Sequence, residues 1–407
     1  MVKRWVIRAI LSATLLFSGN PPCQAALTPL EISQLEKEKL GVPVRGEWLS
    51  ALEKYRKKVS GQYGTDFAFI FNFAQQAILK SQHNQGKSRG VWYWNLEIEQ
   101  DLWKGADLFV EFEVDRGKGV DKFLPTYSIY NDNSGEDAWF YLPALYLEQR
   151  LLGDKLFLAA GKLDMSYWFD CNEAANSADT QFFSSSLVNS LTIPFPANGI
   201  GALATFSPDE WVYLQFGAAT ARASYTRVGL SDAFNSAFFI AEAGLAPRFF
   251  SLPGNYRFIF HSNHEKLGYV DSADEEETKK NDFGWALGFD QAITRQVTLF
   301  ARYGAADPKV RDIEHFWSCG AQVVEPIPGR KFDLLAFGVA QSIMGDEYLR
   351  ANGEDAARAE TMYEIYYSLG FNNAVSLTPD IQIVTNPNAD KTAETEIVFG
   401  LRFLLSF

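Results

Sequence analysis

The chain has 407 residues, and its 50 Asp and Glu against 37 Lys and Arg give a formal net charge of −13 at pH 7. Such an acidic chain is a poor partner for nucleic acid or for an anionic membrane surface. Its three cysteines are too few to be the main support of a fold of this length. Aromatic residues make up 15% of the chain, and a membrane β-barrel needs many aromatics for its lipid-facing surface and its interfacial girdles.

Residues 1–25 have the layout of a secretory signal. Basic residues come first, an apolar run extends from Ala9 to Phe17, and small residues surround Ala25. The alternative is a short membrane anchor, but the run falls well below the ~20 residues that a spanning helix needs. We therefore expect cleavage after Ala25 and export from the cytoplasm.

Residues 26–64 are predicted to form a helical arm. Thr28 is a suitable cap for a first helix. A second helix is indicated by EWLSALEKYRKKV, in which Trp48, Leu52 and Tyr55 fall on one stripe. We expect the arm to pack at the mouth of the following domain, because the sustained heptads of a coiled coil or partner module are missing.

From residue 65 onward, large apolar residues recur at every second position, which is the pattern of β-strands. The stretches FAFIFNF, VWYWNLEIE and DLFVEFEVD show it first, and the last two alternate apolar with polar residues. The total is about sixteen strands. The later ones are expected near residues 139–150, 155–163, 200–207, 210–220, 237–247, 255–264, 282–293, 296–305, 315–325, 331–341, 359–372, 374–385 and 394–407.

The predicted connections between these strands alternate in length. Long connections at 80–88, 116–138 and 164–199 alternate with short ones such as 101–105 and 151–154. An even strand count with short turns at one end and long loops at the other is the signature of an outer-membrane barrel. We therefore predict an all-β fold, a transmembrane antiparallel β-barrel over residues 65–407. Its short turns and the helical arm would face the periplasm, and its long loops would be extracellular.

The final strand, ETEIVFGLRFLLSF, has a large apolar residue at every second position and ends on Phe407. In a barrel this strand must close against the first one, since an unpaired edge inside a membrane is prohibitive. Its outward face meets lipid. A terminal strand of this kind is also the pattern that the barrel-assembly machinery recognises, so we expect that machinery as a partner during biogenesis.

Several motifs in the middle and at the end of the chain resemble the carbohydrate-selective porins of the OprB type. They are LYLEQRLLGDKLFLAAGKLD, the stretch from IPFPANG to FGAATA, and the C-terminal run from YEIYYSLG to GLRFLLSF. The resemblance implies a sixteen-stranded, sugar-permeable barrel in a Gram-negative outer membrane, with carbohydrate solutes, outer-membrane lipid and lipopolysaccharide as partners. The segment 221–281 matches poorly, which leaves the identity of the sugar open.

The face of each strand opposite the aromatic face is expected to line the lumen. It carries charges of both signs, which disfavours a selective anion channel, and carboxylates with Arg forks suit the hydroxyl groups of sugars. For any single charge the competing interpretation is a solvated wall residue. The candidates for lining the pore or binding sugar are Glu148, Arg150, Lys162, Asp164, Trp168, Arg302, Glu364, Tyr366, Asp380 and Arg402.

The long loop from residue 164 to 199 is expected to fold inward and narrow the pore. Trp168 and its aromatic neighbours near the start of this loop are candidates for stacking on sugar faces, or alternatively for a girdle at the level of the lipid headgroups. On the closing strand, Arg402 lies between two lipid-facing residues and must therefore point inward. It is either a structural partner of Asp380 or a planar fork for sugar hydroxyls, and the second interpretation is favoured.

The residues give little support to an enzyme, a metal site or a cofactor site. His261 and His264 lie three apart on a strand and hence on opposite faces, which is unsuited to one metal ion. Neighbouring carboxylates such as Glu111 and Glu113 imitate a glycosidase pair, but they are expected in any polar wall. We therefore predict a sugar-selective porin. The alternatives are a general diffusion porin or, less favoured, a barrel-type adhesin or structural protein.

Overall fold

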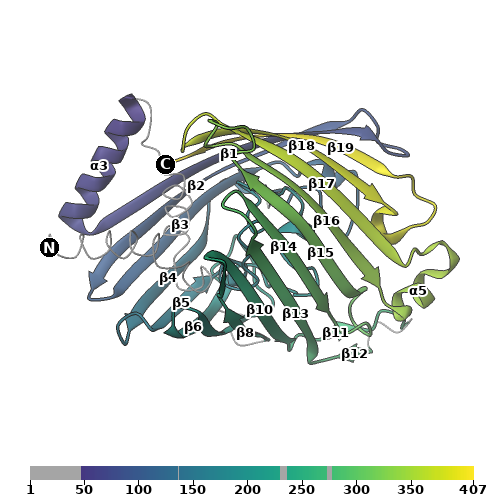
Figure 1. Ribbon diagram of the computed structural model, residues 1–407. Coiled ribbons are helices and arrows are strands. Elements are labelled where there is room, and N and C mark those ends of the chain that lie inside the picture. The colour runs from purple at the N-terminus through teal and green to yellow at the C-terminus, as the bar shows by residue number, and fades with distance from the viewer. Residues whose placement is uncertain (1–46, 136, 230–235, 273–276) are drawn as a thin grey trace.

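The structure is a computed structural model that describes residues 47–135, 137–229, 236–272 and 277–407. The predicted signal and the first part of the predicted arm, residues 1–46, lie outside the described residues. Sixteen strands form one closed antiparallel barrel, as the sequence predicts (Figure 1). They are β1 (Thr65–Lys80), β2 (Ser88–Trp103), β3 (Ala106–Arg116), β4 (Tyr141–Leu151), β5 (Leu156–Leu163), β6 (Gly199–Asp209), β7 (Val212–Thr220), β8 (Ala237–Leu245), β10 (Leu252–Asn263), β13 (Asp282–Ala292), β14 (Val297–Ala305), β15 (Ile313–Val324), β16 (Leu334–Met344), β17 (Ala359–Gly370), β18 (Val375–Thr385) and β19 (Glu396–Ser406).

Short elements complete the described part of the chain. The two-residue strand β9 (Arg248–Phe249) pairs with the start of β10, and β11 (Leu267–Gly268) pairs with β12 (Thr278–Lys279) within one loop. The helices are α3 (Glu47–Tyr63), α4 (Ser185–Val188) and α5 (Asp346–Asn352). None of these helices is long and apolar enough to cross a membrane.

The barrel closes where β1 pairs with β19. Their antiparallel register runs from the pair of Ile70 and Ser406 to the pair of Lys80 and Ile397. Phe407 extends this ladder, because its backbone N–H and C=O both bond to Phe69 at 3.0 Å, and the two rings stack with centroids 5.3 Å apart. Closure leaves no unpaired strand edge in the barrel, which is what a membrane requires.

The period of two along the strands separates an apolar outside from a polar inside. On β10, Phe258 and Phe260 are half exposed and point outward, whereas Arg257 and His261 are buried on the inner side. The other strands follow the same alternation. An apolar outer surface with polar side chains inside is the arrangement of a membrane barrel.

The connections sort by length as the sequence predicts. Short turns such as 104–105 and 152–155 lie at the end of the barrel where α3 leads into β1, and α5 lies in a connection at the opposite end (Figure 1). The guanidinium of Arg56 on α3 binds the Asp66 carboxylate at the start of β1, with Nε 2.7 Å from Oδ1. This ion pair holds α3 at the mouth of the barrel, which is where the sequence predicts that the helical arm packs.

Candidate pore constriction

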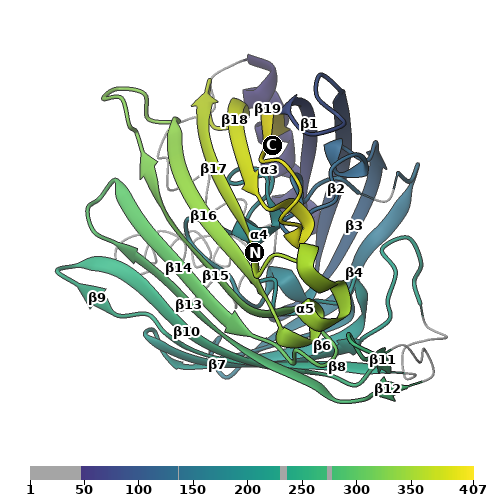
Figure 2. The ribbon, with the colours of Figure 1, turned by 90° about the vertical axis from the view of Figure 1, so that its right-hand side faces the viewer.

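The loop between β5 and β6, residues 164–198, folds into the barrel as the sequence predicts. Its helix α4 lies inside the ring of strands (Figure 2) and packs on β16. All of its four residues are buried. We call residues 164–198 the inward loop. A loop in this position narrows the water-filled lumen, since the barrel wall itself is continuous.

Apolar side chains hold the inward loop against the wall. Phe182 packs edge-on against Phe300 of β14 and Tyr366 of β17, with ring centroids 5.6 and 5.1 Å apart. The backbone of β16 comes so close that a Cβ on Gly338 would lie 2.8 Å from Leu187. Glycine in a strand often marks such a close approach, and here it makes room for the loop.

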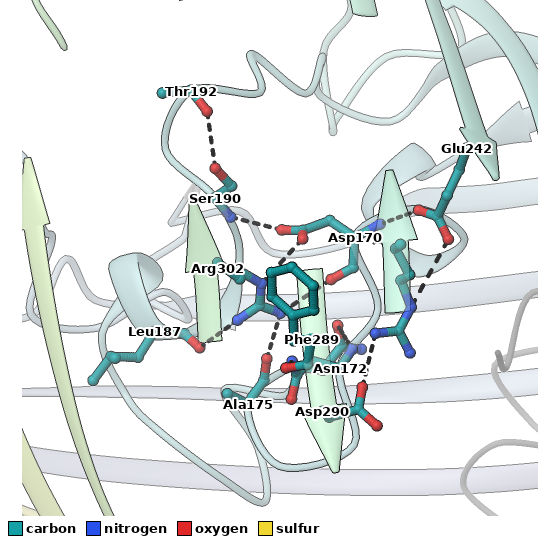
Figure 3. Close-up of polar contacts among 12 residues, drawn as sticks. Asp170, Asn172, Ala175, Leu187, Ser190, Thr192, Glu242, Phe289, Asp290 and Arg302 are labelled. Carbon is teal, nitrogen blue, oxygen red and sulfur yellow. Dashed lines mark hydrogen bonds and ion pairs between the residues drawn. The ribbon is translucent and has the colours of Figure 1, made fainter. Parts of the chain in front are cut away.

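Arg302 of β14 anchors the middle of the inward loop (Figure 3). Its Nε donates to Oδ1 of Asp170 at 3.0 Å, and its two amino groups donate to backbone carbonyls of Asp170, Ala175 and Leu187 at 2.6–3.3 Å. Asp170 in turn accepts the backbone N–H of Ser190 at 2.7 Å. The guanidinium is fully buried, so this ion pair joins three parts of the loop to one strand.

Asp170 occupies an unusual backbone position. Its φ of 59° lies in the left-handed region, which Asp tolerates better than most residues. Its backbone N–H donates to the carboxylate of Glu242 on β8 at 2.9 Å. Asp170 is therefore bonded to two strands, to β8 through its backbone N–H and to β14 through its carboxylate.

Glu364 and Arg402 anchor the far part of the inward loop. The Glu364 carboxylate of β17 accepts the backbone N–H groups of Phe183 and Ser184 at 2.5 and 3.0 Å, at the start of α4. Arg402 of β19 donates to the carbonyls of Ala178 and Gln181 at 2.6 and 2.8 Å. Its guanidinium also lies 4.3 Å from the ring centre of Phe183, a cation–π distance.

A second loop, residues 117–140 between β3 and β4, contacts the inner wall near the first. Glu360 of β17 accepts the backbone N–H groups of Tyr127 and Ser128 at 3.1 and 2.8 Å. The Tyr130 hydroxyl donates to Glu396 of β19 at 2.7 Å. Both loops are bonded to the side of the lumen formed by β17–β19, and the inward loop also contacts β8 and β14.

Asp179 of the inward loop lies where the two loops meet. Its Oδ1 accepts from Asn72 of β1 at 3.0 Å and from Asn133 of the second loop at 2.9 Å, and also from the hydroxyl of Tyr93. Burial raises the pKa of Asp179 to about 6, although Arg402 and the Asn72 hydrogen bond act in the opposite direction. Burial likewise raises the pKa of Asp121 in the second loop to about 6.

The structure places most of the predicted pore residues on the inner face, but several of them hold loops. Arg302, Arg402 and Glu364 bind the backbone of the inward loop as described above. Lys162 donates to the carbonyls of Leu142 and Tyr225 at 2.8 and 2.5 Å. The Tyr366 ring packs on Phe182. The guanidinium of Arg402 thus donates to loop carbonyls, whereas the interpretation favoured from the sequence was that it binds sugar hydroxyls.

Trp168 is packed away from the open lumen. Its indole is 1% exposed and stacks on Phe157 with centroids 5.1 Å apart, and Tyr146 meets it edge-on at 6.2 Å. A sugar therefore has no access to its faces in this structure, and the indole does not form part of a headgroup girdle. Its neighbour Tyr167 is 38% exposed.

Another group of candidates lies on the wall formed by β2–β5. Glu148 and Arg150 of β4 are buried or nearly so, and the Arg150 guanidinium lies 3.2 Å from the Asp107 carboxylate and 3.8 Å from that of Glu148. Asp164 begins the inward loop and accepts from Ser166. On the opposite wall, Asp380 of β18 is 1% exposed.

Sequence reasoning missed Asp170, Glu360 and Asp179 as loop anchors. The alternation along β17 places Glu360 on the same inner face as Glu364, so the pattern alone could have predicted that the Glu360 side chain points inward. Asp170 and Asp179 lie in a loop without periodicity, and no local signal identifies the partners that the fold brings to them.

Comparison with known proteins agrees with this architecture. The family described as carbohydrate-selective porin, OprB family, matches residues 92–407. Porin AaxA of Chlamydia pneumoniae is 26% identical over 295 residues, which cover 71% of this chain and 64% of that protein. The chain thus spans less than two thirds of the length of this curated relative.

Solved structures show the same fold. The high-pH structure of OprB from Pseudomonas putida has a TM-score of 0.76 and 17% identity, and the match covers 89% of this chain and 97% of that one. The outer-membrane channel DcaP of Acinetobacter baumannii has a TM-score of 0.56 and 11% identity over 84% of this chain and 97% of that one. With the family match over most of the barrel, these likenesses lead to one assignment: the chain belongs to the OprB family of carbohydrate-selective porins.

Proposed function

We propose that this porin lets carbohydrates, meaning monosaccharides and small oligosaccharides, diffuse passively across the outer membrane into the periplasm. The observation that carries the proposal is the inward loop. Buried anchors on β14, β17 and β19 hold it inside the barrel, where it would narrow the passage. A fixed constriction lined by polar groups suits a solute that is recognised by hydrogen bonds as well as by size.

The chemistry of the passage supports a hydroxyl-rich solute. Carboxylates such as Glu113 and Asp164 accept hydrogen bonds, and Tyr167, a residue that is 38% exposed, carries a hydroxyl that can donate and accept. Weak and multiple contacts of this kind allow a solute to enter and to leave, which conduction requires. Family and fold are those of channel proteins, and the proposal assigns no catalytic step.

Liposome swelling tests the proposal. Purified protein in liposomes is expected to pass small sugars faster than uncharged, non-sugar polyols of equal size. Permeation ranked by size alone, with no preference for sugars, would assign the protein instead to the general diffusion porins.

The proposed location rests on the family and the fold, and the proposed processing rests on the sequence pattern of residues 1–64. We infer that residues 1–25 are removed on export and that residues 26–64 remain as a periplasmic arm before the barrel domain, 65–407. N-terminal sequencing of the protein extracted from outer membranes is expected to begin at Ala26. A mature chain that still starts at Met1 would contradict this division.

A further inference from the structure

The hairpin between β1 and β2 carries two cations at the end of the barrel opposite α3, the end where α5 also lies (Figure 1). Lys87 and Arg89 are both exposed there. Their charged groups lie over one aromatic ring, with the Lys87 Nζ 4.5 Å and the Arg89 guanidinium carbon 5.0 Å from the ring centre of Phe123. Phe123 belongs to the second loop, so two separate parts of the chain form this cluster.

The cluster borders the lumen rather than the lipid. Val120, three positions before Phe123, belongs to the same buried hydrophobic cluster as Ile78 of β1, which places the start of the second loop inside the ring of strands. Arg89 has the same place in the alternation along β2 as Val91, whose side chain is buried on the inner face. The two cations therefore lie at the entrance of the lumen.

Hydrogen bonds position the hairpin and the loop relative to each other. The Lys87 Nζ donates to Oδ1 of Asn84 at 2.7 Å, and Nδ2 of the same Asn84 donates to the carbonyl of Phe123 at 2.9 Å. In the turn, Ile78 and Lys87 are joined by a backbone bond of 2.8 Å, and Gly86 supplies the left-handed conformation, with a φ of 82°. A ligand that binds here has less side-chain freedom to remove than at a loose surface.

The positive charge at this entrance is not paired with carboxylates. Lys118 and Lys122, on either side of Val120 in the second loop, are exposed as well. Among the residues that the structure describes, neither these two lysines nor the two cations of the hairpin form an ion pair with a carboxylate. Asp121 lies in the same stretch, but its carboxyl group accepts from the backbone N–H of Tyr130 at 2.6 Å and from the hydroxyl of Ser134 at 3.1 Å.

Two like charges over one ring repel each other, although the ring attracts each of them. An anion between them relieves the repulsion and accepts hydrogen bonds from both. A phosphate or a carboxylate fits this arrangement, because the Arg89 guanidinium offers a planar fork and the Lys87 ammonium a point charge beside it. The uncharged hydroxyl of a neutral sugar gains less from the same two groups.

We propose that the entrance of this porin binds the anionic group of phosphorylated or acidic sugars at Lys87 and Arg89, with Lys118 and Lys122 raising the local concentration of such solutes. The proposal rests on the proposed function for its sugar solute and adds the charge of that solute. A basic cluster at the entrance increases the rate of capture. The charges of both signs on the inner wall stay as they are, so the cluster does not make the barrel a general anion channel.

Current block by glucose 6-phosphate, compared with glucose, tests the charge preference in a bilayer of zwitterionic lipid. In 0.1 M KCl, half-maximal block is expected at an about fivefold lower concentration of the phosphate ester, which is the gain typical of exposed ion pairs. This advantage is expected to shrink in 1 M KCl, because salt screens exposed charges. Equal block by the two sugars in 0.1 M KCl, or stronger block by glucose, would overturn the proposal.

A pair of double variants locates the effect. Lys87→Gln combined with Arg89→Gln is expected to remove the preference for glucose 6-phosphate. Lys104→Gln combined with Arg295→Gln removes the same charge from exposed short turns at the opposite end of the barrel, and the preference is expected to persist. Faster migration of the unboiled protein on a gel confirms that both variants fold. A preference that survives in the first variant, or that is lost equally in both, would refute the assigned site.

Inorganic phosphate separates the anion site from the sugar channel. Phosphate alone is expected to raise the concentration of glucose 6-phosphate needed for half-maximal block, because the two compete for the same cations. No competition by phosphate would contradict the anion site. Block by glucose without any preference for its phosphate ester would refute the anion site and leave the sugar channel intact. Block by glucose 6-phosphate and by phosphate, but by no uncharged sugar, would refute the proposed function and leave the anion site standing.

Discussion

At the scale of single residues, the arginines inside this barrel act as loop anchors. Arg302 donates hydrogen bonds from Nε and both amino groups to the carboxylate and carbonyl of Asp170 and to two further backbone carbonyls, and its side chain is buried. A guanidinium suits this task because its donors lie in a rigid planar fork, which an ammonium group cannot reproduce. Truncating such a side chain leaves buried carbonyls and the Asp170 carboxylate without their partner, which is costly.

The first prediction concerns Arg302. Arg302→Ala is expected to release the inward loop, so single-channel conductance should rise and sugar block should weaken. Arg302→Lys should restore only part of the block, because one ammonium cannot serve three separate carbonyls and a carboxylate. Barrel yield should stay near that of the wild type, since the strand ladder of β14 is untouched.

A matched control for this substitution lies on the same hairpin. Arg295 is exposed in the turn between β13 and β14, so Arg295→Ala removes the same charge without reaching the loop. Its conductance and sugar block are expected to equal those of the wild type. Unaltered conductance and block in Arg302→Ala as well would show that the ion pair does not fix the constriction.

At the scale of elements, the strands were predictable from the sequence and the loop anchors were not. The period of two along β10 or β17 is a local property, and it identifies which side chains point inward. The partner of an inward side chain depends on how a distant loop packs. Arg302 and Asp170 are separated by 132 positions, and no spacing pattern connects them. The sequence therefore predicted that Arg402 points inward, but it left the partner of the guanidinium open between Asp380 and sugar hydroxyls and favoured the sugar.

The second prediction concerns the pH dependence of the inward loop. Because burial raises the pKa of Asp179 above its usual value, the docked loop binds a proton more readily than the released loop does. Docking is therefore most stable at low pH and weakens as pH rises through about 6. Brief openings to a larger conductance should be more frequent at pH 7.5 than at pH 5.

Asp179→Asn isolates the contribution of this carboxyl group. The amide imitates the protonated acid, so the variant should show fewer openings at pH 7.5 and a smaller change between the two pH values. Some pH dependence should remain, because burial also raises the pKa of Asp121 in the second loop. Openings in the variant that still rise as steeply with pH as in the wild type would contradict this assignment.

The third prediction concerns the closing strand. Phe407 bonds to the Phe69 backbone in both directions and stacks on its ring, so it continues the seam between β1 and β19. Phe407→Ala is expected to lower the yield of folded barrel more than Phe399→Ala, which removes an outward aromatic from the same strand. Folded barrel is measured as the fraction that migrates faster on a gel before boiling. Equal losses in both variants would remove the special role of Phe407 in assembly.

At the scale of the whole molecule, the barrel is a closed wall and the two inner loops decide what passes. The number of strands and the lengths of their connections were predictable because the same unit, an alternating strand followed by a turn or loop, recurs along the whole barrel sequence. The course of the passage instead depends on how two loops, between β3 and β4 and between β5 and β6, pack together inside the barrel, and this packing is not a repeated pattern. Arg302, Glu364 and Glu360 hold that packing on one side of the lumen, and Trp168 packs on β4 and β5 on the other.

The most direct test of this account is the ion current through single channels during titration with sugar. A constriction that recognises its solute predicts block that saturates with concentration, and it predicts that Arg302→Ala raises the concentration needed for half-maximal block while increasing the open current. Current that falls only in proportion to the viscosity of the sugar solution, equally in wild type and variant, would contradict the central claim that the inward loop forms a sugar-selective constriction.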